Sequence, residues 1–285
     1  MPDDSSGQSI KSLVNGQDSS VISIFDRSVL YGDGCFETIL IHQHKPVLAE
    51  LHYQRLVESC KLFNIPLDCR VLDSEVEQLL SLNAASGILK IIVSRGSGGR
   101  GYGAAEISET SRILQFHETP PETNLQKEGA NVVLCQHRLA NSSVLAGHKN
   151  LNRLDQVLAS AEIVDGFSEG LCLDQNGLLV EGCKSNLLMA RGGELYTPGL
   201  QTAGVRGVML QYLQAKFEQQ GITILPVHWA LEELLQCDEV FLCNSIMGVW
   251  PVIKLVENAR VCTFPIGSFT QQAIRYHHEL LAVSP

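Results

Sequence analysis

The stretch AGHKNLNRLDQVLA, residues 146–159, places a lysine between a Gly-His pair and leucines that recur at helical spacing. Leu151, Leu154 and Leu158 lie three and four residues apart, which predicts a helix that opens at the lysine segment. Because a lysine is rarely buried unless it is paired, this pattern by itself favours a solvated Lys149. A chemical role for Lys149 therefore needs support from the rest of the chain.

Composition and charge limit the class of protein. The 285-residue chain is 45% hydrophobic and 18% charged, which is typical of a globular protein rather than a disordered or fibrous one. Its net charge of −10 gives no attraction for nucleic acid or an anionic membrane, so neither is expected as a partner. An anionic small-molecule substrate would have to be bound by locally placed arginines.

The nine cysteines are scattered without a CxxC pair, which favours reduced thiols over disulfides or a zinc site, so no metal is expected. The polar, acidic start MPDDSSGQSIK lacks the features of a signal peptide. There is no run of about 18 apolar residues that could span a bilayer. The expected compartment is the cytoplasm.

A proline pair divides the chain into two parts. Pro120 and Pro121 exclude regular structure, so residues 119–122 are expected to link a smaller N-terminal domain, 1–118, to a larger C-terminal domain, 123–285. In the first domain a helix is expected at 51–60, and strands are expected at 21–25, 36–41, 88–93 and 111–118.

The second domain combines hairpins with helices. Turns at Asn176-Gly177 and Gly192-Gly193 separate short apolar runs, and an amphipathic helix is expected from Val205 until Gly221 ends it. The predicted strands are ANVVLCQHRL, GLCLD, LLVEG, NLLMA, ELYTP, ITILPV and EVFLCN. This mixed order predicts two α/β domains (mixed α+β) rather than a regular doubly wound sheet.

Three segments carry residues suited to ligand binding. In RGSGGRGYG, residues 95–103, glycines leave Arg95 and Arg100 on a loop free to approach a ligand, although a flexible loop without function is about as consistent. TAGVRG precedes a helix, where the backbone N–H groups of Val205 and Arg206 would suit a phosphate. Glu181 ends a strand, and spacing alone favours an exposed side chain.

Six motifs, in order, resemble one family. They are DRSVLYGDGCFET, HYQRL, the lysine segment, EGCKSNL, TAGVRG and CNSIMGVWPV. Together they resemble the fold type IV pyridoxal-phosphate enzymes, a two-domain family that includes branched-chain aminotransferases, D-amino-acid aminotransferases and aminodeoxychorismate lyases. The resemblance implies pyridoxal 5'-phosphate as the cofactor and a homodimer as the assembly.

The resemblance also implies roles for individual residues. Lys149 would bind the cofactor covalently, with Asn150 capping the helix that follows, and Glu181 would keep the pyridine nitrogen protonated. The remaining cofactor contacts would be a phosphate-binding arginine, two backbone N–H donors, a hydroxyl donor and an amide that orders the ring environment: Arg55, Val205, Arg206, Ser245 and Asn186.

Within the family, GDGCF, SRGSGGRGY and HKNLNRLDQVL are most similar to the aminodeoxychorismate lyases. The implied reaction is elimination of pyruvate from 4-amino-4-deoxychorismate to give 4-aminobenzoate, with Lys149 as the base. Arg95, Arg100 and Tyr102 are the candidates for binding the substrate carboxylates. Glu37 is more similar to the aminotransferases, so a branched-chain or D-amino-acid aminotransferase is the alternative, and a binding protein without catalysis is a third possibility.

Overall fold

The computed structural model describes residues 11–99, 101–103, 109–121 and 123–283. The chain divides between Pro120 and Pro121 into two compact units, and three residues of one helix, Glu50–His52, group with the second unit. The expected mixed α/β class is confirmed, because each unit is built on a sheet covered by helices.

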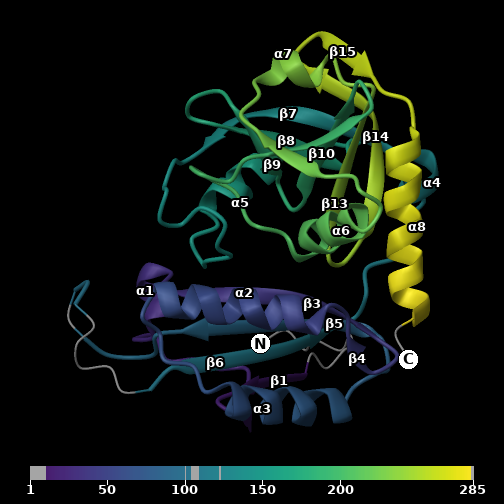
Figure 1. Ribbon diagram of the computed structural model, residues 1–285. Coiled ribbons are helices and arrows are strands. Elements are labelled where there is room, and N and C mark those ends of the chain that lie inside the picture. The colour runs from purple at the N-terminus through teal and green to yellow at the C-terminus, as the bar shows by residue number, and fades with distance from the viewer. Residues whose placement is uncertain (1–10, 100, 104–108, 122, 284–285) are drawn as a thin grey trace. The chain divides into compact units, whose positions relative to one another are not determined.

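Unit 1 is an antiparallel six-stranded sheet in the order β2-β1-β6-β5-β3-β4 (Figure 1). Its elements are β1 (Lys11–Val14), β2 (Gln17–Asp18), α1 (Arg27–Tyr31), β3 (Gly34–His42), β4 (Lys45–Pro46), α2 (Ala49–Leu62), α3 (Cys69–Ser81), β5 (Gly87–Ser94) and β6 (Ser111–His117).

One face of this sheet forms the core of unit 1. Alternate residues of β3 and β5, such as Ile39 and Leu89, are fully buried. They join Leu56 of α2 and Leu72 of α3 in one hydrophobic cluster, so both helices cover the same face. The period-2 burial along the strands follows from the alternation of side chains across a sheet.

The expected strand at 21–25 is wrong. Val21, Ile24 and Phe25 are 74%, 72% and 65% exposed, and the segment belongs to none of the described strands. The chain turns at Ile24 and Phe25 because Asp26 begins a helix: its carboxylate accepts a hydrogen bond from Ser28 N at 2.8 Å as the N-cap of α1.

Unit 2 holds a nine-stranded sheet in the order β12-β11-β10-β13-β14-β7-β8-β9, with β15 paired to β14. The pairs β11–β12, β14–β7 and β7–β8 are parallel and the others are antiparallel. Its elements are α4 (Leu125–Glu128), β7 (Ala130–Leu139), α5 (Leu154–Ser160), β8 (Glu169–Asp174), β9 (Leu179–Gly182), β10 (Asn186–Arg191), β11 (Glu194–Pro198), α6 (Val208–Glu218), β12 (Ile224–Val227), α7 (Leu231–Leu234), β13 (Glu239–Asn244), β14 (Gly248–Glu257), β15 (Arg260–Thr263) and α8 (Ser268–Val283).

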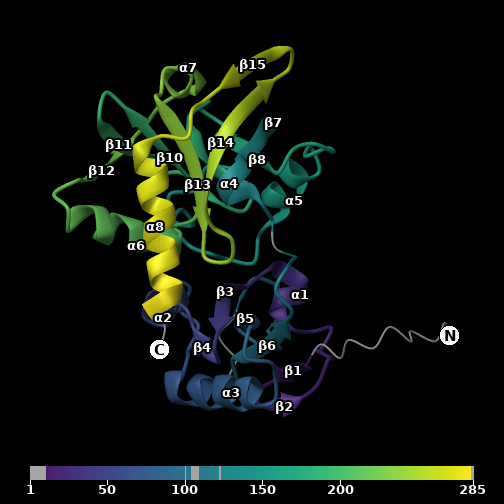
Figure 2. The same cartoon turned by 90° about the vertical axis from the view of Figure 1, so that its right-hand side faces the viewer.

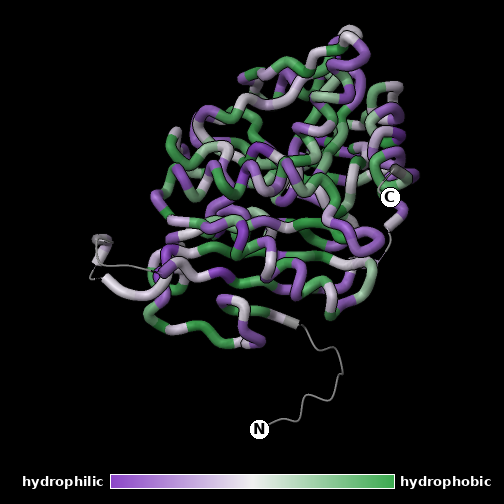
Figure 3. The backbone as a smooth tube through the Cα atoms, turned by 60° about the horizontal axis from the view of Figure 1, so that its bottom comes forward, coloured by the Kyte–Doolittle hydropathy of each residue, from purple (hydrophilic) through white to green (hydrophobic). Residues whose placement is uncertain are grey.

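Several strands of this sheet are covered on both faces, whereas β12 and β15 are largely exposed. β8, β9 and β13 are buried along almost their whole length, as helices α5, α6 and α8 lie against the sheet (Figure 2). Figure 3 shows hydrophobic and hydrophilic stretches alternating along the chain.

None of the helices in the described parts of the chain is long and apolar enough to cross a membrane.

Two helices begin later than the sequence predicts. Helix α5 starts at Leu154 rather than beside the lysine, and Asn150 does not cap it, because its side-chain oxygen accepts a hydrogen bond from Asn152 N at 3.0 Å. Helix α6 starts at Val208, three residues after Val205. Both shifts have one cause, because the segment before α5 pairs with the segment before α6, Gly147 with Val205.

Candidate active site

The lysine loop is fastened to the segment 202–206 by backbone hydrogen bonds. Ser142 N donates to Thr202 O at 2.6 Å, and Gly147 N donates to Gly204 O at 2.9 Å. Gly147 also forms an isolated parallel bridge with Val205. This pairing holds Lys149 in the loop between β7 and α5, where its side chain is half-buried.

Glu181 on β9 faces this loop. The residue is 5% exposed, so the expectation of an exposed strand-end glutamate is wrong. Burial raises the pKa of Glu181 to about 7, and this rise is opposed by the hydrogen bond from Val205 N and by the positive charges of Arg153 and Lys149. A buried carboxylate of this kind needs a cationic or hydrogen-bonding partner.

The peptide group of Val205 ties Glu181 to a second predicted residue. Val205 N donates to Glu181 Oε2 at 2.8 Å, while Val205 O accepts from Asn186 Nδ2 at 2.8 Å. Asn186 also lies against Gly207, where a Cβ atom would collide with Asn186 Oδ1. The strand ends of β9 and β10 are therefore fixed to the segment before α6.

The structure brings five of the predicted cofactor residues together in unit 2: Lys149, Glu181, Asn186, Val205 and Arg206. The N–H groups proposed to bind phosphate have protein acceptors here, Glu181 Oε2 for Val205 and Gly147 O for Arg206. The phosphate role of these groups stays a prediction. A bound phosphate would have to share or replace these acceptors.

Ser245 lies in the turn between β13 and β14. Asn244 orders this turn by accepting from Ile246 N at 3.0 Å and Met247 N at 2.7 Å. Asn244 Nδ2 also donates to Lys184 O at 3.1 Å, and β13 pairs Cys243 with Asn186. The turn that carries Ser245 is thus joined to the connection that follows Glu181.

Arg55 belongs to unit 1, where it is paired with Glu37. Arg55 Nε and Nη2 donate to the two Glu37 oxygens at 2.7 and 2.6 Å, and both residues are buried. This bidentate pair joins α2 to β3 and fixes the orientation of the guanidinium. The predicted contact of Arg55 with the cofactor phosphate stays a prediction.

The interpretation of Arg95 as a loop residue free to reach a ligand is wrong. Its Nε and Nη2 donate to Asp33 at 2.8 and 3.0 Å. Its Nη2 and Nη1 also donate to the carbonyls of Phe63 and Asn64 at 2.7 and 2.8 Å, just past the end of α2. Arg95 therefore joins the start of the glycine-rich loop to α2.

Arg27 holds the other end of that loop. Its guanidinium donates to the carbonyls of Gly101, Tyr102 and Gly103 at 3.1–3.3 Å, and its Nε donates to Asp33 at 2.8 Å. Burial opposes ionisation of Asp33, but hydrogen bonds from Arg95 and Arg27 keep its pKa below the ordinary value. The sequence reasoning did not identify Arg27 or Asp33, although both lie in the motif DRSVLYGDG.

Of the other two substrate candidates, Tyr102 is 88% exposed, with its ring centroid 5.5 Å from that of Tyr31. Such a ring is available to a ligand. Arg100 lies outside the described residues. Both assignments stay predictions.

Two further residues lie beside Glu181 and were not among the predicted cofactor contacts. Arg153 and Gln156 lie four and seven residues after Lys149, and both interact with Glu181. Arg153 Nε and Gln156 Oε1 are buried and have no hydrogen-bond partner within the described structure. These two atoms could accommodate a polar ligand.

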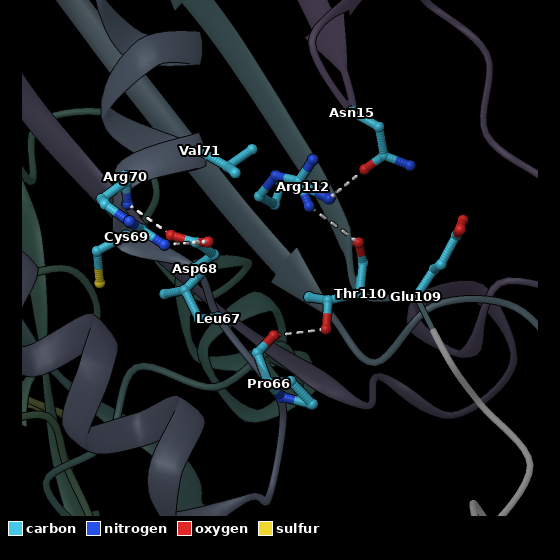
Figure 4. A pocket seen from close by; sticks show the side chains of 10 residues that line it. All are labelled: Asn15, Pro66, Leu67, Asp68, Cys69, Arg70, Val71, Glu109, Thr110 and Arg112. Carbon is cyan, nitrogen blue, oxygen red and sulfur yellow. Dashed lines mark hydrogen bonds and ion pairs between the residues drawn. The ribbon is translucent and has the colours of Figure 1, made fainter.

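A surface hollow of about 860 Å³ lies elsewhere in unit 1 (Figure 4). Arg112 lines it but is paired with Glu75 at 2.8 Å, and Arg70 is paired with Asp68 at 3.5 Å. The hollow contains none of the predicted site residues. We assign it no ligand.

Comparison with known proteins shows the family of the chain. The model of the amino-transferase class IV family matches residues 34–255, and the chain belongs to this family. It is 34% identical to an aminodeoxychorismate lyase of Vibrio harveyi, over 91% of this chain and 96% of that protein. The crystal structure of 4-amino-4-deoxychorismate lyase from Pseudomonas aeruginosa is 38% identical, covers 94% of this chain and 98% of that one, and superposes with a TM-score of 0.88.

An aminodeoxychorismate lyase of Bacillus subtilis is 29% identical over 86% of both chains. Several branched-chain and D-alanine aminotransferases compared with the chain are 24–28% identical. The lyase relatives are therefore more similar to this chain than these aminotransferases are.

Proposed function

We propose that the protein is a pyridoxal-phosphate-dependent carbon–oxygen lyase that converts 4-amino-4-deoxychorismate to 4-aminobenzoate and pyruvate, a step in folate biosynthesis. The observation that carries this proposal is the buried carboxylate of Glu181, which accepts a hydrogen bond from Val205 N beside the loop that holds Lys149. It occurs in a chain that is 34% identical to a lyase over 91% of its length.

The residues of unit 2 fit the cofactor. Glu181 is buried with a pKa near 7, so a protonated pyridine nitrogen would provide the cationic partner that favours its carboxylate form. The unpartnered atoms Arg153 Nε and Gln156 Oε1 lie on residues that interact with the same carboxylate. Lys149, Glu181 and Asn186 would hold the ring, with the backbone of Val205 and Arg206 and the hydroxyl of Ser245 near the phosphate.

When bound, pyridoxal phosphate supplies an electron-accepting ring that stabilises negative charge on the carbon next to the substrate nitrogen. Glu181 maintains that capacity by favouring the positively charged ring nitrogen. Asn186 fixes Val205, whose N–H group orients the Glu181 carboxylate. These contacts are formed by the protein alone, so the Glu181 carboxylate is oriented before the cofactor binds, although a phosphate at Val205 N would have to share this donor with Glu181.

Lys149 moves the proton. Its Nζ, as a neutral amine, takes the proton from the ring carbon that carries the substrate amino group. The carbon–oxygen bond at the adjacent carbon breaks, the enolpyruvyl group leaves and is protonated to pyruvate, and the six-membered ring becomes aromatic.

The substrate carboxylates require positive charge in a protein of net charge −10. Arg100 and Tyr102 are the proposed contacts, and Arg27 holds the backbone carbonyl of Tyr102.

A product assay tests the reaction. Purified protein with pyridoxal phosphate is given freshly prepared 4-amino-4-deoxychorismate without any keto-acid acceptor, and pyruvate and 4-aminobenzoate are measured. Equal amounts of both are expected. If neither forms, while an amino acid and 2-oxoglutarate are consumed, the aminotransferase alternative replaces the lyase.

We also propose a homodimer in the cytoplasm. Helix α5 turns its apolar face outward, with Leu154, Val157 and Leu158 at 69%, 59% and 47% exposure, and such a face usually marks an interface. All the cysteines are free thiols, as expected in a reducing compartment. Leu158→Glu should produce monomers in analytical ultracentrifugation, and Val261→Glu, at an exposed site on β15, should not.

A further inference from the structure

Three buried cysteines in unit 2 bring their sulfur atoms together. Cys135 on β7, Cys172 on β8 and Cys183 just after β9 are all free thiols and at most 7% exposed. Cys183 Sγ lies 3.9 Å from Cys135 Sγ and 3.8 Å from Cys172 Sγ, and all three sulfurs lie within 4.8 Å of one another. We propose that they form a binding site for one thiophilic metal ion of the Cu(I) type.

The sulfur triangle has the size that such an ion needs. Metal–sulfur bonds to thiolates are about 2.3 Å long, so three sulfurs arranged in a plane around one ion lie about 4 Å apart. The distances from Cys183 Sγ to Cys172 Sγ and Cys135 Sγ, 3.8 and 3.9 Å, are close to this value. Small side-chain rotations would therefore be enough to place one ion between the three sulfurs.

The set of ligands favours Cu(I) over Zn(II). Thiolate ligands select soft ions, and structural zinc sites almost always have four protein ligands in a tetrahedron. Among the described residues, the metal-binding group contains these three cysteines and no histidine or carboxylate. A three-coordinate soft ion fits this group without a fourth ligand.

Gly170 leaves room beside the sulfurs. A Cβ atom at Gly170 would lie 2.5 Å from Cys135 Sγ and 3.1 Å from Cys183 Sγ. An alanine there would push on two of the three ligands. This position therefore provides a variant that retains every thiol but disturbs the triangle.

The site lies next to the proposed catalytic groups. Cys172 is paired with Glu181 across β8 and β9, and directly paired residues point to the same face of a sheet. Cys135 Sγ lies 3.5 Å from Ala159 O, on the helix that carries Gln156 beside Glu181. If the proposed function holds, metal occupancy should change catalysis through β9, but binding itself does not depend on that function.

Copper binding tests the proposal directly. Reduced protein is mixed with Cu(I) without oxygen, in the presence of bathocuproine disulfonate as a competing chelator, and desalted before copper and protein are measured. A parallel sample is refolded with Cu(I), because the site is buried. We expect one copper per chain and a sulfur-to-metal charge-transfer band in the ultraviolet.

Matched variants locate the ion. The bound copper ion should be lost in each of three variants: Cys172→Ala, Cys183→Ala and Gly170→Ala. Cys243→Ala, which alters another fully buried cysteine, should retain the copper ion. The double variant Cys35→Ala/Cys60→Ala removes the sulfur pair of unit 1, 3.5 Å apart, and should also retain it.

Thermal unfolding separates a lost ligand from misfolding. Cu(I) should raise the Tm of the wild type and of Cys243→Ala, and leave the Tm of a folded Cys172→Ala unchanged. The proposal is overturned if Cys172→Ala retains the copper, if the unit 1 double variant loses it, or if Zn(II) displaces it at equal concentration. Copper counting requires no enzyme activity, so failure here leaves the lyase proposal untouched.

Discussion

Glu181 Oε2 accepts a hydrogen bond from the backbone nitrogen of Val205 at 2.8 Å, which ties a buried carboxylate to the segment before α6. Burial outweighs this contact and raises the pKa of Glu181 to about 7, above its ordinary value of 4.5. The folded protein without cofactor therefore binds the carboxyl proton of Glu181 more tightly than the unfolded chain does. The stabilisation of the fold that comes from the raised pKa of Glu181 is full below pH 4.5 and declines as the pH rises to about 7.

Cofactor affinity should also depend on the ionisation of Glu181, but it should increase with pH where the folding stability declines. A protonated pyridine nitrogen requires the carboxylate form of Glu181, so affinity should rise between pH 5 and 7 and then level off. Spectroscopic titrations with pyridoxal phosphate at several pH values measure this dependence. Glu181→Gln should flatten it, whereas Glu169→Gln, which removes another buried carboxyl with a pKa near 7, should not.

Glu181→Gln should also retain cofactor but lose most turnover. The amide is similar in size and can still accept the Val205 hydrogen bond, yet it cannot stabilise a positive charge on the ring nitrogen as a carboxylate does. The expected loss in kcat is about a hundredfold or more, as for other preorganised electrostatic contacts to a transition state. Steady-state kinetics at saturating cofactor measure it, and near wild-type kcat would refute the role of Glu181.

Borohydride reduction should fix the cofactor on Lys149. The half-buried lysine lies in the loop that pairs with Val205, whose N–H group donates to Glu181. After reduction and proteolysis, mass spectrometry should find the label on the peptide that contains Lys149. Lys149→Ala should fold normally and remain unlabelled, and a label on another lysine would contradict the assignment.

Sequence motifs identified residues that the fold brings together, but local patterns misplaced the boundaries of the elements that carry them. Lys149 and Glu181 were selected because they lie in motifs that resemble a known family, and the structure places both beside the segment that carries Val205. Their cofactor roles stay predictions. The starts of α5 and α6 were misplaced because the segments before them pair with each other, Gly147 with Val205, and local spacing cannot show such pairing. The strand expected at 21–25 failed because the capping carboxylate of Asp26 determines that segment.

The role of Arg95 was misread for a related reason. The glycines that follow Arg95 favour a mobile loop, but Asp33, which binds Arg95, lies 62 residues earlier in the chain. Asp33 also accepts a hydrogen bond from Arg27. One carboxylate therefore fixes both arginines that hold the glycine-rich loop. Only the folded chain shows which charges are already paired.

The last prediction therefore concerns Arg95. Its guanidinium makes two contacts with Asp33 and two with carbonyls after α2, and its side chain is 17% exposed. Arg95→Ala should lower the free energy of unfolding by about 2–3 kcal/mol, because Asp33 and the two carbonyls lose their donors. Arg95→Lys should recover little of it, since lysine cannot form the bidentate contact.

Arg70→Ala is the matched control. Arg70 is also paired with an aspartate, but its side chain is 92% exposed and the N–O distance is 3.5 Å. Its removal should change stability by less than about 0.5 kcal/mol. Urea denaturation measures all three variants, and substrate kinetics at a temperature where each is folded give KM. If Arg95→Ala unfolds like the wild type but raises KM alone, Arg95 binds substrate after all, because loss of a purely structural contact would reduce stability first.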